Sequence, residues 1–426
     1  MRIIQMHIIY YFLRLNDKNP NNFGATKILL YFCSMKKRIC FLMDSIFSIG
    51  GVQRVTAVIA KELAKDCDVT IVTFDKEERK DTSLYGLNEA AIQYRFFTYP
   101  GIPKWKRYCC KSYSYLYRKF LPQTWLTSDW YAHSSFPCEK RNALAQVLKE
   151  GDYDVIIGVH APLAVRLAAC RKALKGVRLI GWIHNSYQAL FGKDSLYHIG
   201  PELQKHYEWQ LDKLDATVVL CHDDARKYHI RTEVIYNPLT LTPGAPSQGT
   251  SKKFLAVGRF ARLHKGFDLL IEAFHIFAQQ NDDWTLDIVG EGVEEPLYRN
   301  MIKEYQLEDR IIIHPFTDHI QKYYSEAQVY VLSSRWEGMP LVLMEAMAHG
   351  LPIVASDLPI CKEIMQDNCL YFSNGDVNEL ARQMHEATRM DWRKRSEEAL
   401  WVAQRFSIDA IILQWHRLLD ASESSK

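Results

Sequence analysis

The sequence lacks any apolar run long enough to cross a membrane as a helix. Such a helix needs about 18 to 20 consecutive apolar residues. The apolar start, Met1–Leu15, is short, contains His7 and Arg14, and runs into the polar stretch Asn16–Asn22. A small-residue cleavage site, which a signal peptide would require, does not follow it cleanly. We therefore expect Met35 to be the working start. Residues 1–34 would then be a tail that is either disordered or not part of the native protein.

The chain also lacks a strong charge of either sign and any close cysteine pattern. Its 426 residues carry a formal net charge of only +3, whereas nucleic-acid-binding domains are usually strongly basic. Its ten cysteines include no C-x-x-C spacing, and Cys109-Cys110 is the one tight pair. In a chain of this length such cysteines indicate buried reduced thiols more than a disulfide framework. We therefore expect a cytoplasmic protein with no nucleic-acid partner.

What the sequence does contain, from Lys37 onward, is a regular alternation of short apolar runs and longer amphipathic stretches. In the first half Val52–Ala64 has apolar residues at helical spacing. The apolar runs predict strands at Ile39–Met43, Val69–Phe74, Val155–Val159, Leu179–Ile183, Thr217–Cys221 and Val234–Tyr236. Alternation of this kind predicts a parallel sheet with helices on both faces.

Residues 237–251 break the alternation with three prolines and two glycines, which is typical of a linker. A second series follows, with predicted helices such as Phe267–Gln279 and Leu341–His349. Its predicted strands are Phe254–Val257, Thr285–Val289, Ile311–His314, Val329–Ser333 and Ile353–Ala355. We therefore predict an α/β protein with two tandem Rossmann-like, doubly wound domains, residues 35–236 and 252–407, that face a cleft. A C-terminal segment, 408–426, carries a helix, Ile408–Leu419, placed to fold back across the hinge.

Two candidate sites of the first domain lie after predicted strands, one between Ile39–Met43 and the helix Val52–Ala64 and one directly after Leu179–Ile183. Glycines at Gly50-Gly51-Val52-Gln53-Arg54 would let the backbone approach a phosphate at a helix N-terminus. The alternative is a βα turn without a ligand. His184-Asn185 could bind a sugar hydroxyl, although an isolated histidine is more often a hydrogen-bonded core residue.

A third candidate site lies where the first strand of the second domain ends, at Gly258-Arg259, followed by Lys265. Ligands of open α/β sheets bind outside the carboxyl ends of the strands. Arginine can hold two phosphate oxygens at once, and lysine adds a compact positive charge. The residues therefore suit a diphosphate, and the alternative is a solvated basic loop.

The fourth candidate, Glu337-Gly338-Met339-Pro340-Leu341 followed by Glu345, carries the most information. Pro340 is placed near the first turn of a helix. Glu337 then lies in the loop before the helix and Glu345 lies inside it, so both carboxylates could face one ligand over the helix N-terminus. The alternative is one carboxylate at the helix dipole and another packed in the fold.

Taken together, these motifs resemble those of the retaining glycosyltransferases with two Rossmann-like domains, the GT-B architecture, in family 4. The resemblance covers about Met35 to the C-terminus. The stretches that carry it are Gly50–Val55, Phe254–Arg259, Lys265–Leu270, Asp287–Gly292 and the E-x7-E motif Glu337–Glu345. Among family members, the chain looks most like bacterial enzymes that build capsule, exopolysaccharide or lipopolysaccharide.

The resemblance implies transfer of a hexose from a nucleotide-diphosphate sugar to a saccharide acceptor, which can be lipid-linked. The implied donors are UDP-glucose, UDP-galactose or a UDP-N-acetylhexosamine, and no metal or other cofactor is implied. Arg259 and Lys265 would hold the diphosphate, Glu337 the transferred sugar and Glu345 the ribose. Implied contacts with the substrate come from Gly51, Gln53, His184, Asn185, Gly258, Gly290, Gly338, Met339, Pro340 and Leu341.

Several alternatives stay open at this level. A sugar-nucleotide epimerase shares the architecture, and a non-catalytic partner of another transferase would share the fold. No Asp-x-Asp motif follows a predicted strand, which agrees with a metal-independent reaction. Retention could proceed through a covalent intermediate, although the resemblance favours a front-face displacement. The hinge sequence Ile235–Leu239 contains Pro238 where relatives often have glycine, and residues 99–137 match no family motif.

Within that unmatched region, residues 104–120 combine basic and aromatic side chains without any acidic residue. The basic members are Lys104, Lys106, Arg107, Lys111, Arg118 and Lys119, and the aromatic members are Trp105, Tyr108, Tyr113, Tyr115, Tyr117 and Phe120. One interpretation is peripheral docking on an anionic membrane, because aromatic rings favour the headgroup zone and basic side chains favour anionic lipid. The other, which periodicity favours slightly, is a helix whose aromatics pack on the first domain.

Overall fold

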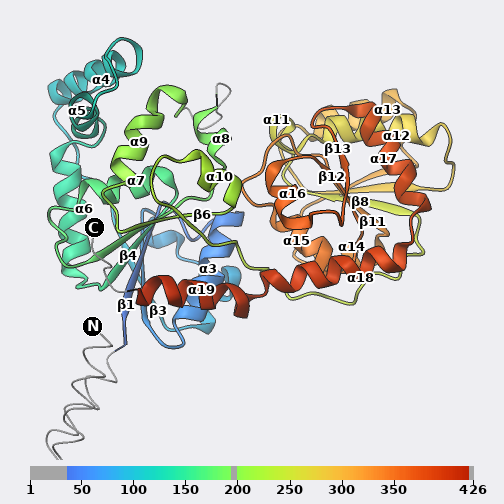
Figure 1. Ribbon diagram of the computed structural model, residues 1–426, viewed down its shortest axis with the longest axis horizontal. Helices are drawn as coiled ribbons and strands as arrows, with labels where there is room; N and C mark the ends of the chain where they lie inside the picture. Colours follow the sequence, from blue (N-terminus) through green and yellow to red (C-terminus); the bar gives the residue numbers. More distant parts are fainter. Residues whose placement is uncertain (1–35, 193–198, 422–426) are drawn as a thin grey trace, which may run out of the picture.

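The computed structural model describes residues 36–192 and 199–421, and the tail expected at residues 1–34 lies outside these ranges. The chain forms two parallel β-sheets, each in its own domain (Figure 1). The first has the order β3-β2-β1-β4-β5-β6-β7 and the second β10-β9-β8-β11-β12-β13. Both therefore follow the 3-2-1-4-5-6 order of doubly wound folds. The α/β fold with two doubly wound domains is confirmed.

The strands of the first sheet are β1 (Arg38–Met43), β2 (Asp68–Thr73), β3 (Ile92–Phe96), β4 (Val155–Val159), β5 (Arg178–Trp182), β6 (Ala216–Val219) and β7 (Glu233–Val234). Those of the second are β8 (Lys253–Val257), β9 (Thr285–Val289), β10 (Ile311–His314), β11 (Val329–Leu332), β12 (Ile353–Ser356) and β13 (Leu370–Phe372). In the central strands β1 and β4, every residue after Arg38 is buried. This is expected of parallel sheets covered by helices on both faces.

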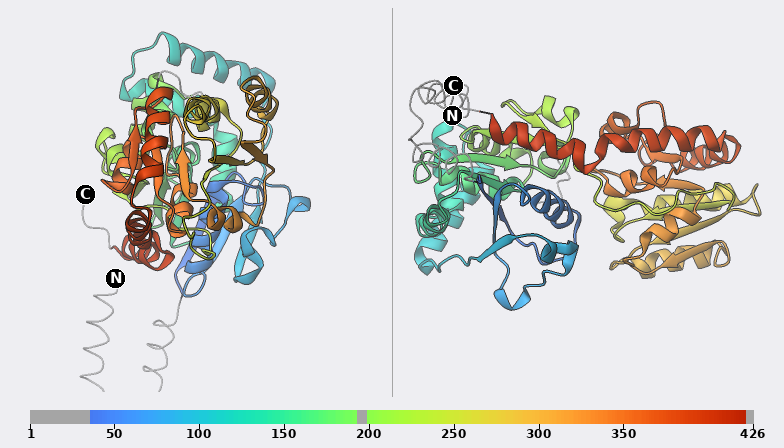
Figure 2. Two further views of the ribbon diagram at one scale, coloured as in Figure 1. Left: turned by 90° about the vertical axis from the view of Figure 1, so that its right-hand side faces the viewer. Right: turned by 90° about the horizontal axis from the view of Figure 1, so that it is seen from below.

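Helices connect the strands in each domain and lie on both faces of the sheets (Figure 2). In the first domain they are α3 (Gly51–Leu63), α4 (Lys104–Lys119), α5 (Trp125–Ser135), α6 (Cys138–Glu150), α7 (Ala161–Ala169), α8 (Tyr187–Phe191), α9 (Gln204–Leu211) and α10 (His222–Lys227). In the second they are α11 (Arg262–Lys265), α12 (Phe267–Ala278), α13 (Glu295–Glu304), α14 (Ile320–Glu326), α15 (Leu341–Ala348), α16 (Pro359–Met365), α17 (Val377–Arg389) and α18 (Trp392–Ala403).

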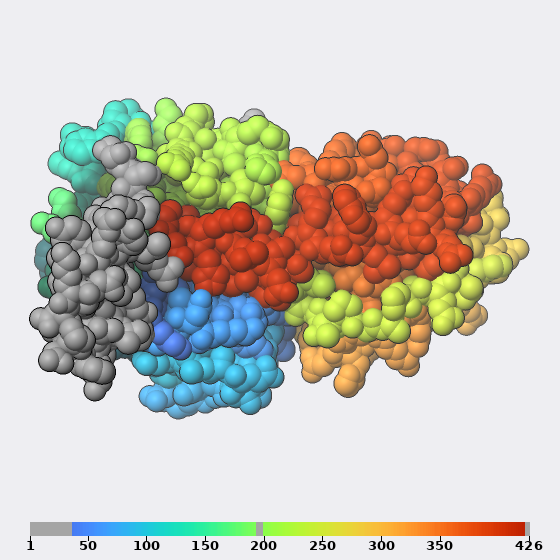
Figure 3. All heavy atoms as spheres, turned by 60° about the horizontal axis from the view of Figure 1, so that its bottom comes forward, coloured from blue at the N-terminus to red at the C-terminus, as the bar shows by residue number. Residues whose placement is uncertain are grey.

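The last helix, α19 (Ile408–Asp420), returns from the second domain to the first. Figure 3 shows the C-terminal helices running along one face of the molecule and onto the first domain. The indole rings of Trp415 and Trp182 lie 4.7 Å apart, which places α19 against β5. Lys37 Nζ donates to the carbonyl of Leu419 at 2.8 Å beside the start of β1. The C-terminal helix therefore packs as part of the first domain.

The segment at residues 237–251 forms the other connection, and most of it lies along the second domain (Figure 3). The Ser247 N–H donates to the His349 carbonyl at 2.9 Å, and Gly244 N–H donates to the His349 imidazole at 3.0 Å. At its start the Leu239 N–H donates to the carbonyl of Phe406 at 2.7 Å. The linker and the α18–α19 junction therefore cross between the domains side by side.

Candidate active site

The loop after β8 brings Lys265 to the carboxyl edge of the second sheet. Helix α11 ends at Gly266, which has φ 65°, a left-handed conformation that glycine adopts without strain. A Cβ at this position would also lie 2.2 Å from the carbonyl oxygen of Ser333, at the end of β11. Only glycine allows this close approach, and it sets Lys265 beside the loop that follows β11.

Lys265 and Glu337, two residues predicted to be catalytic, are in direct contact. The Lys265 ammonium lies 2.6 Å from Glu337 Oε1, and the Ser334 hydroxyl donates to the same oxygen at 2.6 Å. His264 Nε2 lies 3.5 Å from the other carboxylate oxygen. The His264 ring in turn stacks on Trp336 at 3.7 Å between centroids. Glu337 is therefore held by a cation, a hydroxyl and an imidazole.

These partners fix the charge of Glu337 despite its burial. Its side chain is only 6% exposed. Burial alone would raise the pKa of this carboxyl, but the Lys265 ammonium and the His264 side chain outweigh it and hold the pKa well below its usual range. Glu337 is therefore an anion at neutral pH, charge-compensated within the site.

A second ion-pair network holds the two loops of this site together. Both Arg335 guanidinium nitrogens contact the Asp268 carboxylate, at 2.8 and 2.9 Å, and Arg262 Nε contacts it at 2.9 Å. Burial would raise the pKa of Asp268, but Arg335 and Arg262 lower it overall. Asp268 lies in the first turn of α12, so this network ties the α11–α12 loop to the loop of Glu337.

The N-terminus of α15 is one of the places where the second domain meets the first. A Cβ on Gly51 would lie 3.4 Å from Leu341 Cδ1, and a Cβ on Gly338 would lie 2.3 Å from the His184 carbonyl oxygen. The Asn237 N–H donates to the Met339 sulfur at 3.0 Å. Residues Gly51, Gly338 to Leu341 and His184 are thus brought together, with Pro340 capping α15.

Glu345 is bound from the first domain by Arg54, a residue that sequence reasoning had not singled out. One Arg54 guanidinium nitrogen forms a close ion pair with Glu345 Oε1. The Tyr324 hydroxyl donates to Glu345 Oε2 at 2.9 Å, and burial, with the Glu345 carboxylate, raises the pKa of Tyr324 well above its ordinary value. Glu345 is only 2% exposed. Glu337 and Glu345 therefore have separate sets of partners.

Two histidines lie at the carboxyl edge of the first sheet. His184, after β5, is 6% exposed, and its Nε2 has no hydrogen-bond partner among the described residues. Burial lowers its pKa well below the ordinary value, and His160, after β4, lowers it further. His160 has φ 74°, unusual for a non-glycine residue. Burial lowers the pKa of His160 too, opposed by Asp44 and the Asn185 side chain. A neutral His–His–Asn group thus faces this edge.

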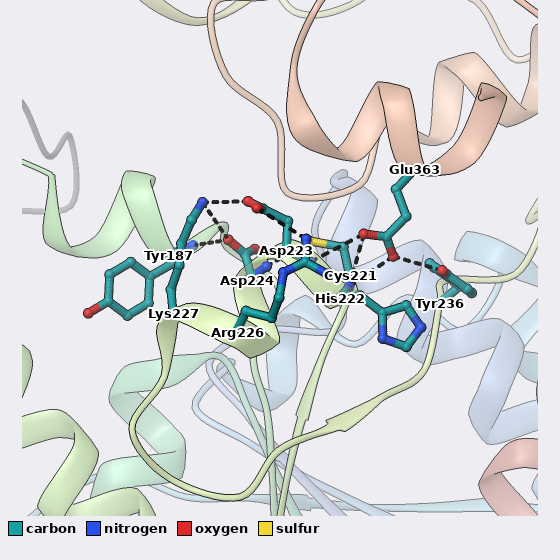
Figure 4. Close-up of polar contacts among 9 residues, drawn as sticks. All are labelled: Tyr187, Cys221, His222, Asp223, Asp224, Arg226, Lys227, Tyr236 and Glu363. Carbon is teal, nitrogen blue, oxygen red and sulfur yellow. Dashed lines mark hydrogen bonds and ion pairs between the residues drawn. The ribbon is translucent and has the colours of Figure 1, made fainter. Parts of the chain in front are cut away.

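A polar cluster at the hinge joins the domains on another side (Figure 4). Glu363, from α16, accepts hydrogen bonds from the backbone N–H of His222 at 2.8 Å and of Asp223 at 3.2 Å, both at the start of α10. The Tyr236 hydroxyl donates to the same carboxylate at 2.7 Å. The Glu363 carboxylate therefore binds both α10 of the first domain and Tyr236, where the first domain ends.

The remaining predicted site residues include Arg259, two glycines and Gln53. Arg259 is exposed, and no hydrogen bond or ion pair joins its side chain to the rest of the described chain. A Cβ on Gly290 would lie 1.9 Å from the Gly258 carbonyl oxygen, so these two glycines touch where β8 and β9 end. Gln53 is half-buried and folds over Gly50, where a Cβ would lie 2.3 Å from its side-chain oxygen.

Within the described ranges, no group of three or more His, Cys, Asp or Glu side chains is arranged to hold a metal ion. In the same ranges, no helix has the length and apolarity needed to span a membrane.

The position of the candidate residues in the two sheets indicates where a ligand would bind. Each doubly wound sheet reverses its strand order at one point, β1/β4 in the first and β8/β11 in the second. The residues named above follow the strands at and beside these two points, where such folds bind ligands.

Two parallel-sheet domains that face each other through these edges define the GT-B architecture. Solved structures agree: the HepE protein of Anabaena, crystallised with UDP and glucose, has a TM-score of 0.67 at 19% identity, covering 90% of this chain and 99% of that one. The lipopolysaccharide outer core galactosyltransferase WaaB has a TM-score of 0.62 at 17% identity, covering 89% and 98%. At these identities the likeness shows the fold.

Family comparisons cover most of the chain. Residues 49–242 match the family described as Glycosyltransferase Family 4, and residues 242–399 match Glycosyl transferases group 1. The chain therefore belongs to the glycosyltransferases, with a family 4 domain followed by a group 1 domain, which confirms the resemblance of its motifs. An uncharacterised glycosyltransferase of Haemophilus influenzae is 25% identical over 402 residues, 90% of this chain and 100% of the relative. The amylovoran biosynthesis glycosyltransferase AmsD of Erwinia amylovora is 32% identical over 175 residues, 39% of this chain and 48% of that protein.

Proposed function

We propose that this glycosyltransferase transfers a hexose from a UDP-sugar to a saccharide acceptor during synthesis of a bacterial surface polysaccharide. The observation that carries the proposal is the joining of Lys265 to buried, ionised Glu337 directly outside the carboxyl ends of β8 and β11. The relative AmsD is named for amylovoran biosynthesis, and the similar HepE structure contains UDP and glucose. Both support a UDP-sugar donor and a polysaccharide product.

In the proposed reaction the second domain binds the donor. Arg259, exposed and unpaired within the described chain, and Lys265 would neutralise charge on the leaving diphosphate as the glycosidic C–O bond breaks. This is the electrostatic role that a metal ion has in other transferases, so we propose a metal-independent reaction. Glu337 would orient the sugar, and Glu345 the ribose.

We further propose retention of configuration by front-face displacement, in which a donor phosphate oxygen accepts the proton of the acceptor hydroxyl. A covalent route would need a carboxylate free to attack the sugar. Glu337 and Glu345, the two carboxylates of the E-x7-E motif, are each engaged by a cation and a hydroxyl instead. Their surroundings suit binding more than nucleophilic attack.

The donor can be tested directly. Purified protein is heated with UDP-glucose, UDP-galactose, UDP-N-acetylglucosamine and the corresponding GDP-sugars, and the shift in unfolding temperature is measured. The stabilising donor is then incubated with candidate acceptors, with and without EDTA, and products are identified by mass spectrometry. Transfer that continues in EDTA is expected. Activity lost on chelation and restored by Mg²⁺ or Mn²⁺ would contradict metal independence, and donor isomerisation without acceptor would indicate an epimerase.

A further inference from the structure

Helices α4 and α5 form a hairpin, residues 104–135, that projects from the first domain on the side away from the second domain (Figure 1). The two helices pack through stacked rings of Tyr117 and Tyr131, 4.5 Å apart. The hairpin is anchored to α9, where Ser128 Oγ lies 2.8 Å from His206 Nδ1. Arg118 pairs with Glu202 at 2.5 Å beside this contact. The hairpin is thus a fixed part of the fold with one face unpartnered.

That unpartnered face is unusually apolar. More than half of the large exposed apolar side chains in the described part of the molecule belong to this hairpin, with exposures from 45% to 72%. They are Trp105, Tyr108, Tyr115, Leu116, Phe120, Trp125, Leu126 and Trp130. The packing of the α4 aromatics on the first domain, which periodicity had favoured, holds for Tyr117 and in part for Tyr113. For the others that interpretation is wrong, because their rings face outward.

Four of the six basic side chains of residues 104–120 form no ion pair with a described acidic residue. Lys106 pairs with Glu139, and Arg118 with Glu202. No ion pair with a described acidic residue is formed by the other four basic residues of the stretch, Lys104, Arg107, Lys111 and Lys119. Exposed aromatic rings interleaved with uncompensated cations match the headgroup zone of an anionic bilayer.

A basic hollow of about 380 Å³ opens beside this face, between α4, α5 and the start of α6. Its lining includes serine hydroxyls and no acidic residue. The basic residues that line it are Arg107, Lys111, Arg118 and Lys140. Tyr115 lines the hollow and is also 60% exposed on the apolar face, so the two features are continuous. The hollow has the charge and the hydrogen-bond donors that a phosphate group requires.

We propose that the α4–α5 hairpin docks this protein on an anionic phospholipid bilayer, with the aromatic face in the headgroup zone and a lipid phosphate in the basic hollow. Docking in this way leaves the second domain free of the membrane (Figure 1). The proposal deepens the proposed function by naming its partner surface and suits a lipid-linked acceptor. It is tested without donor or acceptor, so its failure would leave the transferase proposal untouched.

The first measurement is flotation of the whole protein with vesicles. With vesicles of equal parts phosphatidylglycerol and phosphatidylcholine we expect the protein to float at an ionic strength of about 0.01 M and to be released at about 1 M, where charges are screened within about 3 Å. With pure phosphatidylcholine we expect much weaker binding. Protein that stays unbound with the anionic vesicles at low salt overturns the proposal.

Charge variants locate the surface. Arg107→Gln/Lys111→Gln is expected to lower the partition coefficient about 30-fold, because each basic residue near anionic lipid contributes roughly fivefold. The matched control is Lys322→Gln/Arg389→Gln, which removes the same charge from exposed positions of the second domain. An equal loss of binding in the control would overturn the assignment to the hairpin.

Aromatic variants test the apolar face separately from charge. Trp105→Ala and Trp125→Ala are each expected to weaken binding several-fold at both low and high salt, since the lost burial is not screened. Trp401→Ala, at a ring 64% exposed on α18, is the matched control and is expected to bind like wild type. Unfolding temperatures measured for every variant separate loss of docking from loss of folding. Full binding by both hairpin variants would contradict the proposal.

Discussion

Lys265 and Arg259 lie on the same loop but in different electrostatic surroundings. The Lys265 ammonium compensates the buried Glu337 carboxylate at 2.6 Å. Arg259 is exposed, and its guanidinium contacts no acidic group of the described chain. A change at Lys265 therefore disturbs the folded protein itself, because it leaves a buried charge uncompensated. A change at Arg259 leaves the folded protein as it is.

We expect Arg259→Ala to lower kcat about 100-fold to 1,000-fold without changing the unfolding temperature. Losing one preorganised contact to developing charge typically costs about 2.7–4 kcal/mol of barrier. Lys265→Ala should show a similar loss of kcat together with a lower unfolding temperature, because Glu337 loses its cation. UDP release and thermal melting measure the two effects. Wild-type turnover in both variants would remove these residues from the mechanism.

Changes at Glu337 and Glu345 should affect different kinetic quantities. Glu345→Gln is expected to weaken donor binding more than it slows turnover, since the ribose is distant from the reacting carbon. Glu337→Gln should mainly reduce kcat. Donor dissociation constants from calorimetry and kcat from product formation test this. If both variants bind the donor like wild type, the proposed roles are wrong.

Removing Arg54 is expected to strengthen donor binding, whereas removing Glu345 is expected to weaken it. Arg54 forms an ion pair with Glu345, the carboxylate proposed to bind the donor ribose, so Arg54 and the ribose would compete for it. Arg54→Ala should therefore lower the donor dissociation constant, by about tenfold if roughly 1.4 kcal/mol is released. Arg54→Lys, which keeps the charge, is the matched control. Weaker donor binding in Arg54→Ala would instead make Arg54 a direct donor contact.

At the level of elements, apolar runs located the buried strands well. Observed and predicted bounds of β4, β9 and β10 coincide. In β4 all five residues are buried and apolar, as expected of a strand covered on both faces. The edge strand β3 was missed: its sequence IQYRF contains polar residues, and none of its residues is fully buried. The three-residue β13 is too short to give a pattern. The edge strand β10 was found because its sequence IIIH is mostly apolar, so the pattern fails where an edge strand is polar or very short.

Some residues of the candidate site could likewise be predicted from the sequence, and others could not. Residues after strand ends, such as Gly258, Lys265 and Glu337, could be found because parallel strands bring their carboxyl ends to one edge. His160 follows β4 and could have been found by the same rule. The contact between Arg54 and Glu345 could not, because it depends on how two separately folded domains are placed.

The hairpin anchor should be sensitive to acid. Burial lowers the pKa of His206, on α9, to about 4 from an unfolded value of 6.5. Below pH 6.5 the unfolded chain binds a proton there while the folded protein stays neutral, so unfolding becomes easier as pH falls toward 4. Between pH 7 and 5.5 this residue costs about 1 kcal/mol.

We therefore expect His206→Asn to reduce the difference in unfolding free energy between pH 7 and pH 5.5 by about 1 kcal/mol, whatever its effect at pH 7 alone. Urea unfolding at the two pH values measures this difference. The matched control, His319→Asn, changes an exposed position. A variant at residue 206 with the same pH dependence as wild type would contradict the assigned cause.

For the whole molecule, Glu363 sets how the domains stand relative to each other, because its carboxylate binds α10 and Tyr236 at once. Glu363→Ala should broaden the distribution of domain orientations and raise the radius of gyration measured by small-angle X-ray scattering. Glu363→Gln, which keeps one acceptor oxygen, should lie between. Scattering curves that superimpose for all three proteins would show that the apolar contacts alone set the angle.

The side-by-side crossing of the two connections has a mechanical consequence. Leu239 of the linker and Phe406 of the α18–α19 junction are joined by a hydrogen bond, and the Phe406 ring lies 5.5 Å from that of Tyr236. Both covalent paths between the domains thus pass through one spot, and α19 moves with the first domain through Trp182 and Trp415. A small rotation about this one point would therefore move the second domain against the first and change the contact between Arg54 and Glu345.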